Sequence, residues 1–256
     1  MLAIIGGSGL TTLSSLDATR QEVIRTPYGD PSGALTFGRI GEHAVVFLAR
    51  HGYGHTIPPH MVNYRANLWA LHQSGARGVI SVASVGSIHP DLKPGDIVIP
   101  DQIIDYTWGR TSTFFDGAGT QVTHVDFTEP YDDELRTRII NAARELGIAI
   151  RIGGVYAATQ GPRLETAAEI NRLERDGADV VGMTGMPEAV LARELALPYA
   201  AINVVANYGA GRADSRHGIH FSTVEPVLQD ALGRARRIIE RLVGCNDHCQ
   251  PGGAAG

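Results

Sequence analysis

The stretch "YAAINVVA" (199–206) decides the fold class, because it is apolar at nearly every position. A strand with one face in water alternates apolar and polar residues, whereas a strand covered on both faces is apolar throughout. Further short runs have the same character: "LAII" (2–5), "AVVFLA" (44–49), "GVISVAS" (78–84), "DIVIP" (96–100), "GVYAAT" (154–159) and "ADVVGM" (178–183). These runs predict the strands of a buried sheet.

Helical patterns separate these runs. Residues 62–74 place apolar side chains on one face, and residues 187–196 begin with Pro187, which suits a first helical position. The clearest helix is C-terminal, where an apolar stripe over residues 228–242 is backed by arginines that we expect to face solvent. The alternation predicts one α/β domain over residues 1–243, with a largely parallel or mixed central sheet.

Two segments follow neither pattern. Residues 107–130 are rich in Gly, Thr and aromatic residues and are expected to form an extended loop or a short hairpin. Residues 244–256 are expected to be a disordered tail. Cys245, Cys249 and His248 lie in this tail and resemble half of a metal site, but its glycine-rich sequence favours disorder.

The composition excludes several classes of partner. The chain of 256 residues has a formal net charge of −5, which argues against binding to nucleic acid or to an anionic membrane, although not against a small anionic substrate. The N-terminal "MLAIIGGSGL" lacks a basic region and soon reaches glycines, unlike a signal peptide or a membrane span. With only 2 cysteines, the reducing cytoplasm is the expected location.

Polar side chains follow several predicted strands, at the position where ligands collect in open α/β sheets. The candidates are Ser8 in "GGSG" (6–9), Arg50 and His51 after the second strand, Ser84, and Thr184. Hydroxyls, backbone amides next to glycine, Arg and His all donate hydrogen bonds to phosphate. Each feature also has a structural explanation: a tight glycine turn, an ion pair between Arg50 and a distant carboxylate, or an N-cap at Thr184. Together they favour a phosphate pocket.

Two further residues suit recognition of an organic group. Glu165 ends "QGPRLE" (160–165) where a helix begins, so it either stabilises that helix start or faces a ligand. Asn207 follows the last strand and either forms a turn or uses its amide, which donates and accepts at once.

Several motifs carry a family resemblance. They are "GGSGL" (6–10), "LARHG" (48–52), "IPPHMVNYRANLWAL" (57–71), "PGDIVIPDQIIDYT" (94–107), "QGPRLET" (160–166) and "VVGMTGMPEAVLARELALPYA" (180–200). In this order and spacing, they resemble the trimeric purine nucleoside phosphorylase and methylthioadenosine phosphorylase family. Within it, the chain is similar to the S-methyl-5′-thioinosine phosphorylase subgroup. The resemblance covers about residues 1 to 243.

The resemblance implies a mixed, partly barrel-like sheet wrapped by helices, a homotrimer, and phosphorolysis without a metal or an organic cofactor. Inorganic phosphate would be the co-substrate and would attack the anomeric carbon of a purine nucleoside. By similarity, the phosphate would be bound by Ser8, Arg50, His51, the Ser84 backbone and Thr184. Met183 would lie against the ribose, and His124 would reach the site of the adjacent subunit near the 5′ group.

The residues at the base-binding positions differ from the adenine-specific branch of the family. That branch has two aspartates and a serine where this chain has Asn207, Gly209 and Glu165. A carboxylate accepts a hydrogen bond from the N1–H that a 6-oxopurine carries and adenine lacks. The Asn amide can donate to O6 or N7. Asn207 and Glu165 are therefore the expected catalytic and base-recognition residues for hypoxanthine or guanine.

The 5′ substituent separates two substrates within this class. The position that carries a His in enzymes selective for a 5′-hydroxyl matches Val224, whose apolar side chain suits a methylthio group. His217 and His220 lie just upstream and are alternative ligands for a hydroxyl. The expected reaction converts methylthioinosine to hypoxanthine and 5-methylthioribose 1-phosphate. The alternative is a general phosphorylase acting on inosine and guanosine.

Three other functions fit less well. A methylthioadenosine phosphorylase is opposed by Glu165 and Asn207, and a non-catalytic nucleoside-binding protein by the presence of the phosphate-binding set. A dinucleotide-dependent oxidoreductase is opposed by Thr12, which interrupts the G-x-G-x-x-G pattern that Gly7 and Gly9 begin.

Overall fold

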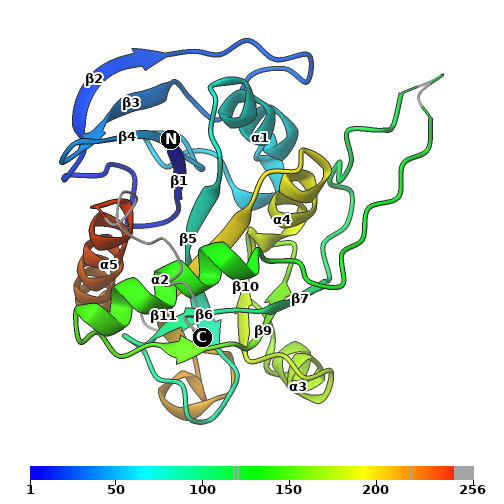
Figure 1. The fold of residues 1–256 in the computed structure, drawn as a ribbon. Coiled ribbons are helices and arrows are strands. Elements are labelled where there is room, and N and C mark those ends of the chain that lie inside the picture. Colours follow the sequence, from blue (N-terminus) through cyan, green and yellow to red (C-terminus); the bar gives the residue numbers. More distant parts are fainter. Residues whose placement is uncertain (118, 120, 220, 245–256) are drawn as a thin grey trace, which may run out of the picture.

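Strand β5 (Val79–Ser87) is the centre of the sheet, because both of its edges are paired. One edge pairs in parallel with β11 (Tyr199–Tyr208) along its whole length. The other edge is shared. β1 (Leu2–Gly6) pairs with residues 79–81 in parallel, and β10 (Val180–Gly182) pairs with residues 86–87 in the antiparallel direction. The sheet therefore branches at β5, as Figure 1 shows.

The structure, a computed structural model, describes residues 1–117, 119, 121–219 and 221–244. The other strands are β2 (Asp17–Glu22), β3 (Leu35–Ile40), β4 (His43–Ala49), β6 (Ile97–Ile99), β7 (Gln102–Asp105), β8 (Arg151–Ile152) and β9 (Val155–Ala158). The main path runs β2-β3-β4-β1-β5-β10-β9-β7, with β6 and β8 continuing from β11. Within the described chain, β2 and β7 at the two ends of this path do not pair with each other. The mixed sheet is thus confirmed, and it stays open.

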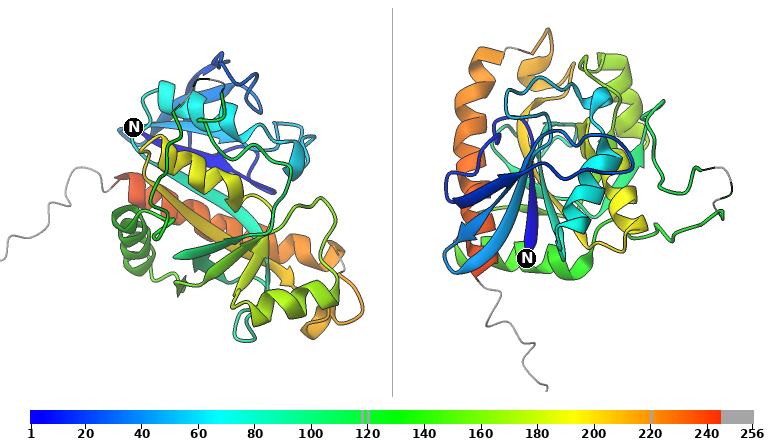
Figure 2. Two further views of the ribbon diagram at one scale, coloured as in Figure 1. Left: turned by 90° about the vertical axis from the view of Figure 1, so that its right-hand side faces the viewer. Right: turned by 90° about the horizontal axis from the view of Figure 1, so that it is seen from above.

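Helices cover both faces of this sheet (Figure 2). α2 (Asp133–Glu145) and α5 (Phe221–Gly244) pack on one face, and α1 (Tyr64–Gln73) and α4 (Gly185–Glu194) on the other. α3 (Ala167–Arg175) packs near β9 and β10. Two short 3-10 turns lie at Pro59–Met61 and Ala213–Ser215. None of the helices described is long and apolar enough to cross a membrane.

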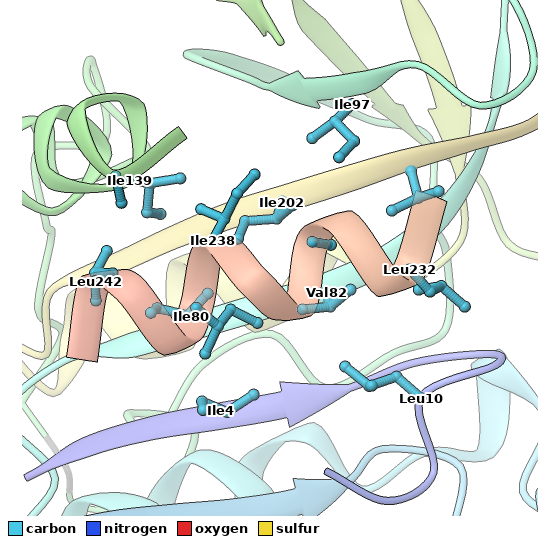
Figure 3. Close-up of a cluster of buried hydrophobic side chains, with 14 of the residues drawn as sticks. Ile4, Leu10, Ile80, Val82, Ile97, Ile139, Ile202, Leu232, Ile238 and Leu242 are labelled. Carbon is cyan, nitrogen blue, oxygen red and sulfur yellow. The ribbon is translucent and has the colours of Figure 1, made fainter. Parts of the chain in front are cut away.

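The central strands are apolar on both faces, as predicted. Ile4 of β1 and Ile80 of β5 belong to the core under α2 and α5. Their neighbours Ile5 and Val79 belong to the core under α1 and α4. Figure 3 shows how the α5 stripe packs onto the first of these cores. All predicted stripe residues of α5 are buried, and Ile238 at its centre is 0% exposed. Burial of each Leu or Ile side chain in the stripe contributes about 1.5–3 kcal/mol.

The sequence patterns found every one of the central strands and missed peripheral elements. β2 has every side chain exposed and the sequence "DATRQE", so no apolar run marks it. β3, β7, β8 and α2 were also not predicted. Residues 107–130 contain no helix or strand in their described part, which confirms an extended loop. Residues 245–256, with Cys245 and Cys249, lie outside the described residues.

Candidate functional site

The branch at β5 creates the candidate site. β1 and β10 approach the middle of β5 from opposite directions and end at Gly6 and Gly182, so residues 82–85 pair with neither strand. A cavity of about 720 Å³ opens beside these residues and is lined by the segments that follow β1, β4, β10 and β11. This volume suits a small-molecule ligand.

Most residues singled out in the sequence meet in this cavity. Its lining includes Ser8, Arg50, His51, Ser84, Glu165, Met183, Thr184 and Asn207. His124 does not line it and is exposed on the loop 107–130. His217 lines a smaller neighbouring cavity of about 380 Å³, which shares Leu164, Glu165 and Ile219 with the larger one. His220 and the side chain of Val224 lie outside the described part of the structure.

Glycine at position 7 lets the chain after β1 lie against β5. A Cβ at Gly7 would lie 2.7 Å from the Val82 carbonyl oxygen and 2.9 Å from Nη1 of Arg50. The amide of Leu10 donates to the Gly7 carbonyl at 3.0 Å, so "GGSG" is also a tight turn. The tight turn therefore forms part of the cavity wall, and Ser8 lies on this turn.

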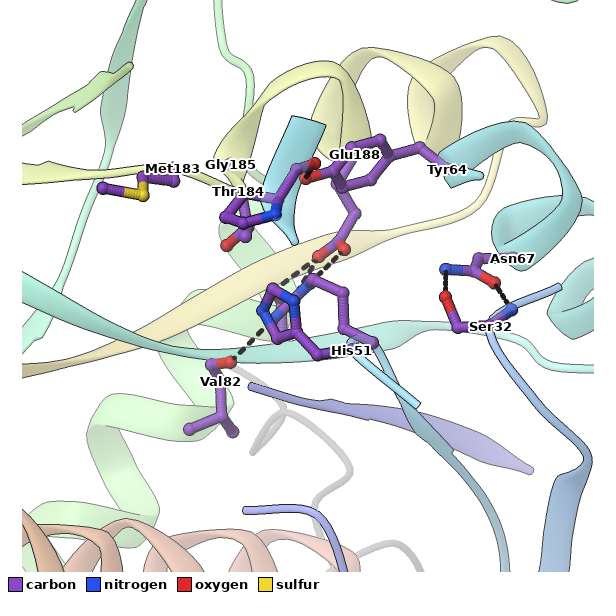
Figure 4. A network of polar contacts seen from close by, with 12 residues as sticks. Ser32, His51, Tyr64, Asn67, Val82, Met183, Thr184, Gly185 and Glu188 are labelled. Carbon is purple, nitrogen blue, oxygen red and sulfur yellow. Dashed lines mark hydrogen bonds and ion pairs between the residues drawn. The ribbon is translucent and has the colours of Figure 1, made fainter. Parts of the chain in front are cut away.

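Arg50 is fully buried at the end of β4, and its fork pairs with Glu188 of α4. Figure 4 labels Glu188 and Val82, where dashed lines of this network end. Nε donates to Oε2 of Glu188 at 2.7 Å, and Nη2 donates to Oε1 at 2.8 Å. Nη2 also donates to Oγ of Ser81 at 2.6 Å, and Nη1 to the Val82 carbonyl at 3.1 Å. The ion pair between Arg50 and a distant carboxylate, one of the alternatives in the sequence analysis, is thus present. Arg50 is part of the cavity wall, but its side chain is 0% exposed, so its charge lies behind the cavity surface.

Glu188 is the buried partner of Arg50 that the sequence analysis did not identify. Its Oε1 also accepts hydrogen bonds from Oγ of Ser81 at 2.7 Å and Oη of Tyr199 at 2.8 Å. Burial raises the pKa of this carboxyl, but the Arg50 charge and the three donors outweigh it, so the pKa lies below its usual value and the carboxylate is ionised. A carboxylate inside the apolar run "MPEAVLA" (186–192) was the available signal.

His51 is buried beside Arg50 and is neutral. Its Nδ1 donates to the Ile57 carbonyl at 2.8 Å, which leaves Nε2 as a hydrogen-bond acceptor. Burial, reinforced by the Arg50 charge, lowers the pKa of His51 to about 4. The His55 ring lies 4.9 Å from the His51 ring, and its Nε2 is 3.5 Å from Oγ of Ser8.

Thr184 occupies the N-cap position of α4, but its side chain makes no capping hydrogen bond. The prediction that its hydroxyl caps the helix is therefore wrong. The backbone amides of Thr184 and Gly185 donate to Oη of Tyr156 at 3.2 and 3.4 Å. Met186 has extended φ and ψ angles of −119° and 139°, so the regular helix runs from Pro187, as predicted. Thr184, three residues before this helix start, lines the cavity.

Glu165 is not needed to cap helix α3. Thr166 is the N-cap of α3: its side chain accepts from the Glu169 amide at 3.1 Å, and the Glu169 carboxylate accepts from the Thr166 amide at 2.7 Å. This capping box is visible in the sequence as T-x-x-E. Oε1 of Glu165 accepts from Oγ1 of Thr159 at 2.7 Å, and Oε2 has no partner among the described residues. The ligand interpretation is the one that the geometry permits.

Asn207 is part of β11 and does not form a turn. The register between β11 and β5 shifts between Val205 and Asn207, and such a bulge redirects a side chain. Nδ2 of Asn207 donates to the Tyr208 carbonyl at 2.7 Å, which leaves one amide hydrogen and Oδ1 for a ligand. At Gly209, a Cβ would lie 3.0 Å from the Ser87 carbonyl oxygen, so a larger residue would crowd the backbone.

The cavity therefore has two chemical regions. The hydroxyls of Ser8 and Thr184, with the positive charge of Arg50 in the wall behind them, form a region that suits an anion. Glu165 and Asn207 supply an ionisable acceptor and an amide for a group with neighbouring N–H and C=O functions. Within the described ranges, no three His, Cys, Asp or Glu side chains are grouped as metal ligands.

Several known proteins are similar to this chain over most of its length. Residues 1–244 match the model of the Phosphorylase superfamily. A probable S-methyl-5′-thioinosine phosphorylase of Pseudomonas syringae pv. tomato is 49% identical over 244 residues, covering 95% of this chain and 98% of the relative. A 6-oxopurine nucleoside phosphorylase of Pyrococcus furiosus is 46% identical over 259 residues, covering 96% of each chain. The methylthioadenosine phosphorylase of Schistosoma mansoni in complex with adenine superposes with a TM-score of 0.90 at 33% identity, covering 95% of this chain and 90% of that one.

The first prediction concerns the ion pair of Arg50. Glu188→Gln leaves the Arg50 charge buried without an ionised partner, so we expect the free energy of unfolding to fall by about 3–5 kcal/mol. Urea denaturation measures it. Glu22→Gln is the matched control, because Glu22 pairs with Arg20 at 3.3 Å with both side chains exposed, and such pairs contribute about 1 kcal/mol or less. Equal losses in the two variants would contradict the prediction.

The second prediction concerns pH. The folded protein protonates His51 near pH 4 and the unfolded chain near pH 6.5, so the unfolded state binds more protons between these values. The stabilisation from this group is complete above pH 6.5 and is lost as the pH falls toward 4. In urea unfolding across this window, His51→Asn should lose less stability than the wild type. The exposed-site control His72→Asn should follow the wild type, and an identical slope in all three proteins would refute the assignment.

Proposed function

Because the chain belongs to the Phosphorylase superfamily, we propose that it catalyses the phosphate-dependent cleavage of S-methyl-5′-thioinosine to hypoxanthine and 5-methylthioribose 1-phosphate. The observation that carries this proposal is Glu165, which lines the cavity, is not needed as a cap and keeps Oε2 free. The name of the Pseudomonas syringae relative supports it. In this proposal inorganic phosphate is the co-substrate, no metal or organic cofactor takes part, and the enzyme works in the cytoplasm.

The phosphate would bind between the chain after β1 and the start of α4. Ser8 and Thr184 would donate through their hydroxyls, and Arg50, in the wall behind them, would attract the phosphate through its positive charge. A phosphate oxygen would form a bond to the anomeric carbon while the bond from that carbon to the purine nitrogen breaks, and the bonding electrons would leave with the purine. Positioning and electrostatic stabilisation of the cationic ribosyl group by the phosphate would lower the barrier.

The purine would lie between Glu165 and Asn207. Oε2 of Glu165 would accept from the purine N1–H, while Thr159 restrains the other oxygen at 2.7 Å. Asn207 would donate to O6 or N7 and so stabilise the departing base. An adenine would place its unprotonated N1 against the carboxylate, a mismatch that costs about 1–3 kcal/mol.

A general 6-oxopurine nucleoside phosphorylase is the second candidate. His217 lines the cavity adjoining the base-binding residue Glu165, where a ring nitrogen could meet a 5′-hydroxyl, and the Pyrococcus furiosus relative carries that name. Efficient cleavage of inosine would favour this function over the methylthio-specific one, in which Val224 would contact the methylthio group. The cavity's base-recognition pair argues against a methylthioadenosine phosphorylase, and its set of phosphate donors argues against a non-catalytic nucleoside-binding protein.

We further propose a homotrimer in which His124 completes the site of the adjacent subunit near the 5′ group. The loop 107–130 extends away from the body of the molecule in both Figure 1 and Figure 2. Trp108 and Val122 on this loop are large apolar side chains and are each 72% exposed. A loop that packs against a second copy accounts for both features.

The third prediction tests base recognition. Phosphate-dependent cleavage of methylthioinosine should exceed that of methylthioadenosine by about tenfold or more in kcat/KM. Glu165→Ser combined with Asn207→Asp should move the preference toward methylthioadenosine, and Glu165→Gln should weaken the discrimination because an amide can donate to N1 of adenine. A wild type that prefers methylthioadenosine would show that the base assignment is wrong.

The fourth prediction tests the contribution of His124 in trans. His124→Ala and Glu165→Gln should each lower kcat/KM for methylthioinosine by about tenfold or more. Co-expression of the two variants should restore part of the activity, because some sites then combine an intact Glu165 with an intact His124 from the neighbour. No recovery, or a monomer by light scattering, would exclude a shared site.

A further inference from the structure

Arg110, in the loop 107–130, makes hydrogen bonds to two turns of the active site. Nη1 donates to the carbonyls of Met183 and Met186 at 2.7 and 2.6 Å, in the turn between β10 and α4. Nη2 donates to the carbonyls of Gln160 and Thr159 at 2.8 and 3.3 Å, in the turn between β9 and α3. Nε donates to the side-chain oxygen of Gln160 at 3.2 Å. One guanidinium thus bridges both turns.

The environment of Arg110 is unusual for a half-buried cation. No ion pair between Arg110 and a carboxylate is found in the part of the chain that the structure describes. The positive charge of Arg110 is instead stabilised by the dipoles of the four backbone carbonyls. Tyr64 also contacts it: its hydroxyl lies 3.2 Å from Nη1, and its ring centre lies 5.4 Å from the guanidinium carbon. Without Arg110, each of these carbonyls would lose a hydrogen-bond donor. A carbonyl that is away from water and unpaired destabilises the folded state.

The two bridged turns carry ligand-facing residues. The first turn leads from Thr159 to Glu165, and the second carries Met183 and Thr184. The turns also touch: a Cβ at Gly161 would lie 2.4 Å from the sulfur of Met183. A shift of one turn relative to the other would therefore move the residues proposed to bind base, ribose and phosphate relative to one another.

We propose that Arg110 is a positioning residue for catalysis, which sets the spacing of the two turns by binding their carbonyls from behind the cavity. The inference rests on the proposed phosphorolysis. Arg110 does not line the cavity, so it acts through Met183, Thr184 and Glu165. A lysine cannot substitute, because its ammonium is a point charge, whereas the planar guanidinium presents donors in several directions at once.

The test compares Arg110→Met and Arg110→Lys with Arg65→Met. Arg65 is the matched control, since it also anchors the loop, through Asp116 at 2.9 Å and the Thr113 carbonyl at 3.3 Å, but contacts neither turn. In steady-state assays with methylthioinosine and phosphate, both Arg110 variants should raise the KM for phosphate and lower kcat, together by about a hundredfold in kcat/KM. Arg65→Met should lose about tenfold less kcat/KM than Arg110→Met, because it loosens the same loop without freeing either turn.

Two further readouts separate positioning from general damage to the fold. Millimolar guanidinium chloride should restore part of the activity of Arg110→Ala, while sodium chloride at equal ionic strength should not. Inorganic phosphate should raise the melting temperature of the wild type and of Arg65→Met more than that of Arg110→Met, because ligand binding stabilises the folded state. This second readout needs no nucleoside.

The outcomes distinguish the two proposals. A wild type that binds phosphate but cleaves no purine nucleoside would refute the proposed function, and the melting shifts would still test Arg110. Arg110 variants with wild-type kinetics and wild-type phosphate shifts would overturn the positioning role. So would equal losses in Arg110→Met and Arg65→Met without rescue by guanidinium, since anchoring of the loop would then explain them. Absence of phosphate binding by the wild type would overturn both.

Discussion

The buried ion pair between Arg50 and Glu188 connects strand β4 to helix α4 beneath the cavity. Both side chains are 0% exposed, so neither charge can be left alone without a large desolvation cost. Ser81 of β5 and Tyr199 of β11 complete the hydrogen bonding of the carboxylate. The pair, together with the apolar residues of α4 that are buried in the core, holds this helix over the sheet and so positions Thr184 before it.

The branching of the sheet is the second constraint. A strand has only two edges, and β5 gives one to β11 and divides the other between β1 and β10. β1 and β10 end facing each other. The segments that follow these two strands therefore bring Ser8 and Thr184 to the same cavity. A regular parallel sheet would have placed these ends side by side along one rim.

Two further features, a helix capping box and a bridging arginine, act on the turns that carry ligand-facing residues. The capping box of Thr166 and Glu169 satisfies the start of α3, so Glu165 can face the cavity. Arg110 binds the carbonyls of this turn and of the turn before α4. Helix capping and a bridging cation are ordinary stabilising devices, and here they leave functional side chains free to bind a ligand.

The sequence by itself determined the buried strands, the apolar stripe of α5 and the polar residues that follow the strands, because these depend on neighbours within one strand or helix. It could not show that the fork of Arg50 pairs with Glu188, 138 positions away, or that Arg110 bridges two turns. It also missed exposed β2, where no burial imposes a pattern. Only the tertiary structure decides which donor meets which acceptor, since those partners come from elements far apart in the chain and are brought together by packing.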